Sequence, residues 1–567
     1  MRCKLINFKD NIIEMLKNEL PDINAESLEQ LIEVPPNPEL GDYAFPVFSL
    51  AKVMRKAPNM IAEELSEKLN SDNFTKIEAN GPYLNFFINQ EVFAKNILAE
   101  VKMAKDEFGK SEIGKGKNVV LDFSSPNIAK TFHIGHLRST AIGNALRNTY
   151  DFLGYNTIGV NHLGDYGTQF GMLITAFKLW GDENAVRENP IPELLKLYVR
   201  INQEAEEDET LKETSREWFR KLEEKDEEAM RLWSFFREAS LIEFARVYKM
   251  LNIEFDSFDG ESFYSDKMDS VINELDAKGL LQESNNTTIV DLEKFDMPPM
   301  LVKKSDGSTL YSTRDLAAAN YRHDTYNFYK SIYVVGSQQI LHFKQLFKVL
   351  ELMGKPWAED CVHVTFGMVS LPEGTMSTRR GNVISLENVL LTAKNKISEI
   401  IEERDIEDKD TLARQIGVGA VVFQELFNDR NKDYVFDWDR ALSFEGETGP
   451  YVQYTHARIC SLLDKGQFNT DMNFDERLLN SPEELEILKL IYGFNSTVVD
   501  ASEKYQPFYI TRHVVELAKA FNKYYNSTEI NVVDENLKHT RLWLCYATKT
   551  VLKNGLGILG IESPERM

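Results

Sequence analysis

The sequence predicts an α/β protein in which a doubly wound, Rossmann-like parallel sheet follows an α+β N-terminal domain and precedes an all-α C-terminal bundle. Three observations predict this fold class. Short apolar strand candidates alternate with helical segments in the middle of the chain, amphipathic helices accompany a strand-like segment before it, and the pattern after about residue 400 is almost wholly helical. A chain of 567 residues is also too long for one hydrophobic core.

The N-terminal domain combines helices with a strand. Phe8, Ile12 and Leu16 recur at helical spacing, and residues 81–88 alternate in the manner of a strand. Glycines between residues 109 and 116 mark a linker to the next domain.

The middle domain is predicted to hold the sheet. The best strand candidates are residues 119–123, 157–160, 332–335 and 362–368. Ligands of such sheets bind at the carboxyl ends of the strands. A charged, helical stretch interrupts the alternation and is predicted to be an insertion. The predicted domains are 1–112, 117–390 with a helical insertion at about 170–300, and 400–567.

Composition indicates a soluble globular protein, with 43% hydrophobic and 27% charged residues. The net charge of −24 argues against a general nucleic-acid binder, because phosphate contacts need Lys and Arg. Much of the acid lies in residues 204–228, which also carry Lys and Arg at helical spacing, as a solvated helix face does. RNA binding would therefore require the remaining basic residues to gather on one surface.

The cysteines and the apolar runs exclude other classes. Cys3, Cys361, Cys460 and Cys545 lie far apart, without a Cys-x-x-Cys pair, which argues against a structural zinc and against a disulfide scaffold. The first residues lack the apolar core of a signal peptide, and no apolar run approaches a membrane span. We expect a cytoplasmic protein that has no membrane partner and holds no metal of its own.

Residues 124–139 are the most informative part of the chain. They follow an apolar strand and contain His133, Gly135 and His136, after which a helical pattern continues to Gly154. A helix N-terminus offers free backbone N–H groups and a positive dipole end to an anion. Gly135 has no Cβ, so a base or phosphate can approach its backbone, and the imidazoles can donate to phosphate oxygens. This predicts a nucleotide site; the alternative is an ordinary strand-to-helix loop.

A second candidate lies at residues 371–382, after the last strand candidate. Its glycines make it flexible, and Ser377, Thr378, Arg379 and Arg380 offer donors and positive charge to a polyphosphate. Taken alone, the segment also fits a polar surface loop.

A third candidate lies in the C-terminal region. Tyr451, Tyr454 and Arg458 have i, i+3, i+7 spacing, so they share one helix face. Planar side chains on such a face can stack on unpaired RNA bases. The alternative is an aromatic stripe in the core.

Residues 124–139 resemble the HIGH signature of class I aminoacyl-tRNA synthetases, and the longer string is similar to the arginyl-tRNA synthetase version. Met376 and Ser377 match the mobile KMSKS loop of that class, but threonines stand where this loop has lysines. In some arginyl-tRNA synthetases a lysine before the HIGH motif compensates for this loss, and Lys130 is the matching residue. The motifs occur in the family's order from the first domain to the last residue.

The resemblance implies a pocket for arginine, whose planar guanidinium is best held by a carboxylate in a two-pronged pair. Tyr311 and Asp315 lie four residues apart at a helix start and, with Gln339, match the family's contacts to this group. Without the resemblance, Asp315 fits equally well as an acid favoured by the helix dipole. The implied arginine-binding residues are Asp122, Ser125, Asn127, His136, Tyr311, Asp315 and Gln339.

The resemblance also assigns residues to catalysis, ATP and tRNA. Two histidines and a lysine would stabilise the phosphates during transfer. Tyr83 and Asn85 match positions that recognise an adenosine of the tRNA D-loop, with part of an edge strand as the alternative. The implied catalytic residues are Lys130, His133 and His136, and the implied ATP contacts are His133, Gly135, His136, Met376 and Ser377. The implied tRNA contacts are Tyr83, Asn85, Tyr451, Tyr454, Arg458, Tyr525 and Met567.

The implied activity is that of an AMP-forming arginine–tRNA ligase. It would activate L-arginine with ATP, with Mg²⁺ bound through the nucleotide, and transfer the arginyl group to the 3′ end of tRNA(Arg). We expect a monomer whose partners are tRNA(Arg) and L-arginine. Two rivals stay open: another HIGH-type enzyme, such as a cysteinyl-tRNA synthetase or a pantothenate synthetase, and a binding protein that descends from a synthetase without activity.

Overall fold

The structure is a computed structural model that describes residues 5–304, 311–370 and 385–567. The chain forms two compact units. The first contains the chain up to Gly109, Arg458–Phe494 and Glu516–Leu552, and the second contains Lys110–Ala457, Asn495–Val515 and Lys553–Met567. The division into three domains stays a prediction, because the C-terminal helices contribute residues to both units.

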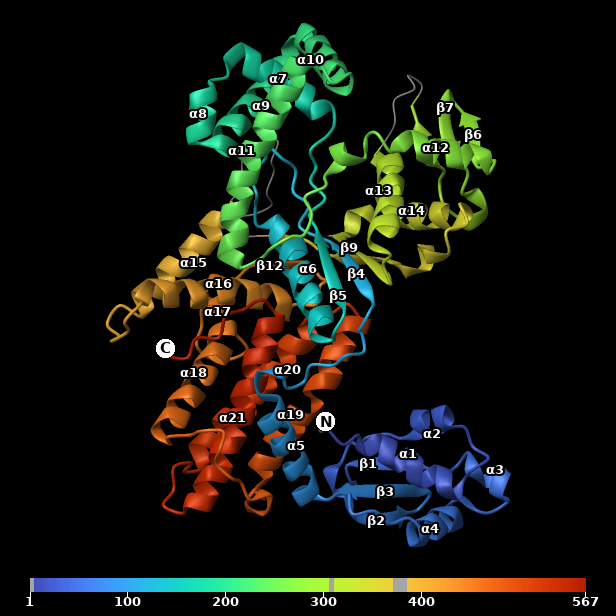
Figure 1. The fold of residues 1–567 in the computed structure, drawn as a ribbon, viewed down its shortest axis with the longest axis vertical. Helices are drawn as coiled ribbons and strands as arrows, with labels where there is room; N and C mark the ends of the chain where they lie inside the picture. The colour runs from blue at the N-terminus through green and yellow to red at the C-terminus, as the bar shows by residue number, and fades with distance from the viewer. Residues whose placement is uncertain (1–4, 305–310, 371–384) are drawn as a thin grey trace. The chain divides into compact units, whose positions relative to one another are not determined.

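The N-terminal part of the first unit mixes helices with strands, as predicted (Figure 1). Its elements are α1 (Phe8–Glu19), α2 (Ala25–Leu31), β1 (Tyr43–Pro46), α3 (Leu50–Met54), α4 (Pro58–Lys68), β2 (Phe74–Asn80), β3 (Tyr83–Ile88) and α5 (Gln90–Ala104). The strands form an antiparallel sheet in the order β1-β3-β2. The side chain of Asn7 caps α1 by accepting two backbone N–H groups, and Phe8, Ile12 and Leu16 are fully buried.

A four-stranded parallel sheet forms the centre of the second unit. Its strands are β4 (Asn118–Asp122), β5 (Asn156–Val160), β9 (Lys330–Gly336) and β10 (Cys361–Phe366), in the order β10-β9-β4-β5. All three pairings are parallel, and Asp122 lies opposite both Val160 and Tyr333. The four strands coincide with the four candidates and confirm the predicted Rossmann-like sheet.

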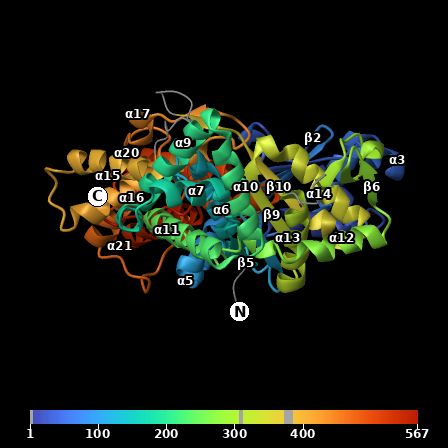
Figure 2. The same ribbon diagram turned by 90° about the horizontal axis from the view of Figure 1, so that it is seen from above.

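Helices cover both faces of this sheet. α6 (Gly135–Phe152) packs on β4, β5 and β9. On the other face, Val120 and Tyr333 share a buried core with Leu316 of α13 (Tyr311–Tyr326) and Leu346 of α14 (Ile340–Leu352). α13 and α14 lie side by side in both views (Figures 1 and 2). Their first turns therefore lie close to the carboxyl ends of β4 and β9.

The insertion is only partly helical. It contains α7 (Thr168–Trp180), α8 (Glu183–Glu188), α9 (Pro190–Glu207), α10 (Glu209–Glu223), α11 (Glu227–Leu251) and α12 (Met268–Ala277), then β6 (Leu281–Ser284), β7 (Thr287–Val290) and β8 (Met300–Lys303). The prediction of a helical insertion was wrong for β6 and β7. Asn285 and Asn286 join them with φ values of 50° and 60°, and two-residue hairpin turns with positive φ at both positions favour Asn.

The region after the sheet is helical, as predicted, apart from one short strand. Its helices are α15 (Leu386–Ile400), α16 (Lys409–Phe427), α17 (Trp438–Ala441), α18 (Gly449–Lys465), α19 (Pro482–Glu503), α20 (Phe508–Ser527) and α21 (Glu535–Ile558). The exception is β12 (Tyr434–Val435), which pairs in parallel with β11 (Val369–Ser370). Across the ranges that the structure describes, no helix has both the length and the apolar character needed to cross a membrane.

Candidate active site

The loop after β4 is held in a strained conformation. Ser124, Ser125 and Ala129 have φ values of 70°, 44° and 59°, in the left-handed region that L residues rarely adopt. The backbone N–H of Ser124 donates to Oγ of Ser139 at 2.9 Å, and that of Ala129 donates to Oγ of Ser240 at 2.9 Å. Strain of this kind persists only where the surroundings fix it, and it collects at functional sites.

His133 and His136 lie against each other at the start of α6, with ring centres 4.0 Å apart. The backbone N–H of His133 donates to Nδ1 of His136 at 3.1 Å, and that of Gly135 donates to Nδ1 of His133 at 3.0 Å. Both Nδ1 atoms are therefore unprotonated, and each neutral ring carries its proton on Nε2. Burial lowers the pKa of His133 to about 4; burial, and then the charge of His133, lowers the pKa of His136 to about 3. The pair offers two neutral N–H donors at neutral pH.

Gly135 makes room for one of these rings. A Cβ at this position would lie 2.7 Å from Cε1 and 2.8 Å from Nδ1 of His133. The space over the glycine, which the sequence suggested for a base or phosphate, is thus taken by the His133 imidazole in this structure.

Lys130 lies within electrostatic reach of the same pair. Its Nζ is 5.6 Å from the ring centre of Tyr198 on α9, and its positive charge contributes to the lowered pKa of His136. These two interactions place the Lys130 ammonium near the histidine pair. Its catalytic role stays a prediction.

The residues predicted as the KMSKS-like loop, including Met376 and Ser377, lie outside the described residues. The residues that follow this loop contact the segment just before α6, which contains His133. The backbone N–H of Leu386 donates to the carbonyl of Phe132 at 2.8 Å, and Ser385 forms an isolated antiparallel bridge with His133.

A pocket of about 520 Å³ lies at the carboxyl ends of β4 and β9, beneath the first turns of α13 and α14. Most of the predicted arginine-binding residues line it; His136 does not. Asn127 and Gln339 are exposed at its wall, and Tyr311 is 55% exposed. The predicted residues that the structure brings together here are Asp122, Ser125, Asn127, Tyr311, Asp315 and Gln339.

Asp315 lies between two imidazoles. Its Oδ2 is 2.6 Å from Nε2 of His342, and its Oδ1 is 3.7 Å from Nε2 of His162. Burial alone would raise the pKa of Asp315, but the hydrogen bond with His342 and the neighbouring positive charges outweigh it and hold this pKa below its usual range. Asp315 is thus an anion in the pocket at neutral pH.

Asp122 is already paired. Its Oδ2 lies 2.8 Å from Nη2 of Arg322, whose side chain is 1% exposed, and its Oδ1 accepts from Oγ of Ser125 at 2.8 Å. The carboxylate therefore fastens α13 and the strained loop to the end of β4. A cationic group in the pocket would meet a neutralised pair at Asp122, whereas Asp315 keeps its charge.

Glu261 is a third carboxylate in the pocket, and sequence reasoning missed it. Its Oε2 lies 3.0 Å from Nη1 of Arg314. Burial raises the pKa of Glu261 to about 7; Arg314 opposes the rise, and the charges of Asp315 and Asp165 add to it. No motif marks Glu261 among the 89 acidic residues of the chain.

The N-terminal residues predicted to contact tRNA, Tyr83 and Asn85, lie in β3, which is the central strand, so the edge-strand alternative was wrong. Tyr83 is half-buried and packs against Phe48, with ring centres 5.6 Å apart. Asn85 is only 3% exposed. Its burial counts against a direct contact between this side chain and an RNA base, because an RNA can reach only exposed donors.

The C-terminal residues predicted to contact tRNA are at least partly accessible. In the second unit, Tyr451 and Tyr454 are half-exposed on α18 beside buried neighbours, which counts against the core stripe, and Met567 is half-exposed. In the first unit, Cζ of Arg458 lies 5.0 Å from the ring centre of Tyr525, which is 37% exposed. Their contacts with tRNA stay predictions.

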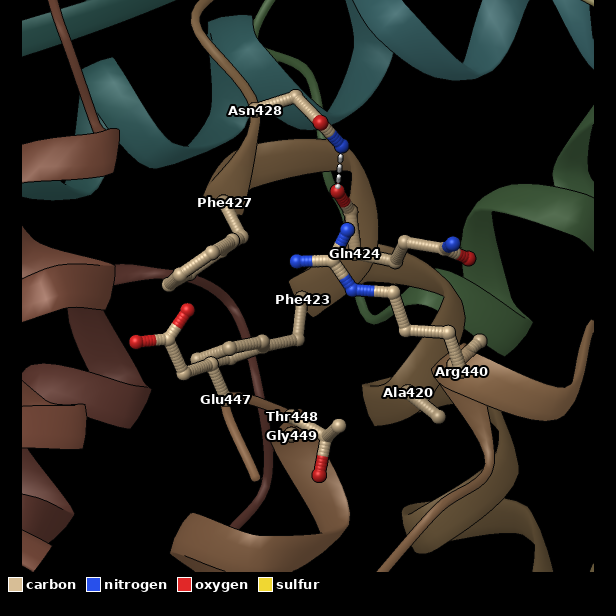
Figure 3. A pocket seen from close by; sticks show the side chains of 10 residues that line it. Ala420, Phe423, Gln424, Phe427, Asn428, Arg440, Glu447, Thr448 and Gly449 are labelled. Atoms are coloured by element: carbon tan, nitrogen blue, oxygen red, sulfur yellow. Dashed lines mark hydrogen bonds between the residues drawn. The ribbon is translucent and has the colours of Figure 1, made fainter. Parts of the chain in front are cut away.

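A much smaller pocket lies among α16, α17 and the start of α18 (Figure 3). Phe423 and Phe427 line it, and the side-chain amide of Asn428 donates to the carbonyl of Gln424 at 2.6 Å. Its volume of about 10 Å³ is room for about one water molecule, so it is no substrate site.

Comparison with known proteins agrees with this geometry. Residues 97–438 match the family tRNA synthetases class I (R), catalytic domain; residues 452–567 match the DALR anticodon binding domain; and residues 7–88 match the arginyl tRNA synthetase N terminal domain. The chain is 57% identical over 566 residues to the arginine–tRNA ligase of Halothermothrix orenii, covering 99% of this chain and 100% of that protein. The chain belongs to the arginyl-tRNA synthetase family. The arginine–tRNA ligase of Clostridioides difficile is 55% identical over 564 residues, with coverage of 99% and 100%.

Solved arginyl-tRNA synthetases share the fold. The enzyme of Plasmodium falciparum superposes with a TM-score of 0.82 at 26% identity, covering all of both chains. The enzyme of Thermus thermophilus superposes with a TM-score of 0.81 at 25% identity, covering 97% of this chain and 100% of that one. Enzymes of this class use ATP. Membership of the family also excludes the alternative that the chain is another HIGH-type enzyme, such as a cysteinyl-tRNA synthetase or a pantothenate synthetase.

Proposed function

We propose that this chain activates L-arginine with ATP and transfers the arginyl group to the 3′ end of tRNA(Arg). In the first step a carboxylate oxygen of arginine attacks the α-phosphorus of ATP, the bond to the β-phosphate oxygen breaks, and pyrophosphate leaves. In the second step a hydroxyl of the terminal ribose attacks the arginyl carbonyl, and AMP leaves.

The arrangement of charge in the pocket is the observation that carries this proposal. An ionised Asp315 faces the pocket beside two carboxylates that already have arginine partners, Asp122 with Arg322 and Glu261 with Arg314. A guanidinium can pair with an ionised carboxylate in a planar, two-pronged contact, and the single ammonium of lysine cannot fill that geometry. The pocket therefore favours arginine.

The side chains at the start of α6 support the part of the proposal that concerns the phosphates of ATP. The neutral imidazoles of His133 and His136 can donate from Nε2 to oxygens whose charge shifts as pyrophosphate leaves. Lys130 adds a positive charge near the same pair. Mg²⁺ would arrive bound to the triphosphate and neutralise part of its charge. The chain's own contribution is to position the reactants and stabilise developing charge.

Amino-acid-dependent exchange of pyrophosphate into ATP tests the proposal. We expect exchange with arginine alone among the twenty amino acids, and only with tRNA(Arg) present. Exchange driven by another amino acid would overturn the assignment.

We also propose that the protein is cytoplasmic and monomeric. Light scattering tests the oligomeric state and should give a mass near 65.2 kDa.

A further inference from the structure

His342 contacts both α13 residues that are predicted to face the arginine side chain. Its Nε2 lies 2.6 Å from Oδ2 of Asp315, and its ring centre lies 5.0 Å from that of Tyr311. The His342 side chain is 8% exposed and belongs to the first turn of α14, three residues after Gln339. One buried imidazole of α14 thus contacts two pocket residues of α13.

The hydrogen bond has a single direction. Asp315 is ionised at neutral pH, so its oxygen accepts and Nε2 of His342 carries the proton. This uses one lone pair of Oδ2 and leaves the others for a ligand. On the opposite side, His162 approaches Oδ1 at 3.7 Å. The orientation of the carboxylate is therefore set before any substrate binds.

Orientation matters for this ligand. A guanidinium presents its N–H groups in a rigid plane, so both carboxylate oxygens must lie in that plane to accept two bonds. A carboxylate that is fixed in advance saves the cost of ordering it during binding.

We propose that His342 is a positioning residue for arginine, which orients the Asp315 carboxylate through Nε2–H and supports the Tyr311 ring. The inference rests on the proposed function and deepens it. It makes His342 a determinant of the preference for a planar guanidinium over the ammonium of lysine.

Two variants separate the hydrogen bond from the packing. His342→Phe keeps a ring against Tyr311 but has no donor, whereas His342→Gln keeps an N–H donor at similar reach but has no ring. His363→Phe is the matched control, because His363 packs on Phe343, as His342 does, but bonds to the carbonyl of Val335. Steady-state charging of tRNA(Arg) gives KM for arginine, KM for ATP and kcat, and thermal melting checks the fold.

We expect His342→Phe to raise the arginine KM about ten-fold, the loss of one charge-assisted bond, with the ATP KM and kcat nearly unchanged. His342→Gln should recover most of that loss, and His363→Phe should leave the arginine KM unaltered. An unchanged arginine KM in His342→Phe, or equal increases in the Phe and Gln variants, would overturn the positioning role. The proposed function is tested separately, because it fails only if the unmodified protein does not charge arginine.

Discussion

The backbone N–H of His133 donates to Nδ1 of His136 at 3.1 Å, which fixes His136 as a neutral ring with its proton on Nε2. Burial lowers the pKa of His136 to about 3, well below that of a free imidazole. The unfolded chain therefore binds a proton here, as pH falls through about 6.5, that the native protein does not bind. Stability must fall in this range, because acid favours the state that binds more protons.

Replacing His136 by Asn should weaken this acid sensitivity. The side-chain oxygen of Asn can still accept the N–H of His133, but position 136 no longer titrates, and only His133 of the pair still does. We expect the drop in melting temperature from pH 7.5 to pH 5 to be smaller in His136→Asn than in the unmodified protein. An equal or larger drop would show that the buried imidazole does not control the acid response.

Lys130→Ala should slow adenylate formation by about 10²-fold, comparable to losing one preorganised donor. The positive charge of Lys130 acts on His136, and lysines are absent from the KMSKS-like motif. Lys196→Ala is a matched control, since Lys196 is an exposed lysine of α9 paired with Glu193. Single-turnover adenylate formation at the normal rate in Lys130→Ala would show that Lys130 does not compensate for the missing KMSKS lysines.

Truncating Tyr454 or Arg458 to Ala should weaken charging of tRNA(Arg) about ten-fold or more, because stacking on a base is worth about 1–3 kcal/mol. The readout is kcat/KM for tRNA, with melting curves as a check on folding. Tyr509→Ala provides a control, as another half-exposed tyrosine on a C-terminal helix. Variants that melt early and charge normally at low temperature would restore the core-stripe interpretation.

The fold followed from the sequence where periodicity was strong. The four parallel strands and the α6 boundaries near Gly135 and Gly154 agree with their patterns, because buried strands read as apolar runs and the helix is closed by glycine. The hairpin at Asn285 was missed, although its two asparagines were a turn signal.

The site was only partly predictable. Asp315 and Gln339 were assigned to the pocket by the family resemblance, and both line it. His162 and His342 line it too, but the sequence analysis gave them no role. Glu261 and Arg322 carry no local pattern: each acts through a partner distant in sequence, Arg314 for Glu261 and Asp122 for Arg322. Such pairings depend on tertiary structure, and one sequence cannot show them.

The affinity for arginine should depend on the ionisation of Glu261. Burial raises the pKa of this carboxyl to about 7, although Arg314 opposes the rise. As pH falls through 7, Glu261 takes up a proton and loses the charge that attracts a guanidinium, so the arginine KM should rise toward acid. Glu261→Gln should show a raised arginine KM with a weaker dependence on pH between 6 and 8. An identical pH profile in the variant would remove Glu261 from the pocket's electrostatics.

The most direct test of the account is the arginine KM of Asp315→Asn. The amide keeps the shape of the side chain but loses the charge-assisted pair with the guanidinium, worth roughly 1.5–3 kcal/mol, so the arginine KM should rise about ten-fold to a hundred-fold. The ATP KM should stay nearly constant, because Asp315 lies in the pocket and not at the histidine pair. An arginine KM equal to that of the unmodified protein would contradict the placement of the substrate guanidinium at Asp315.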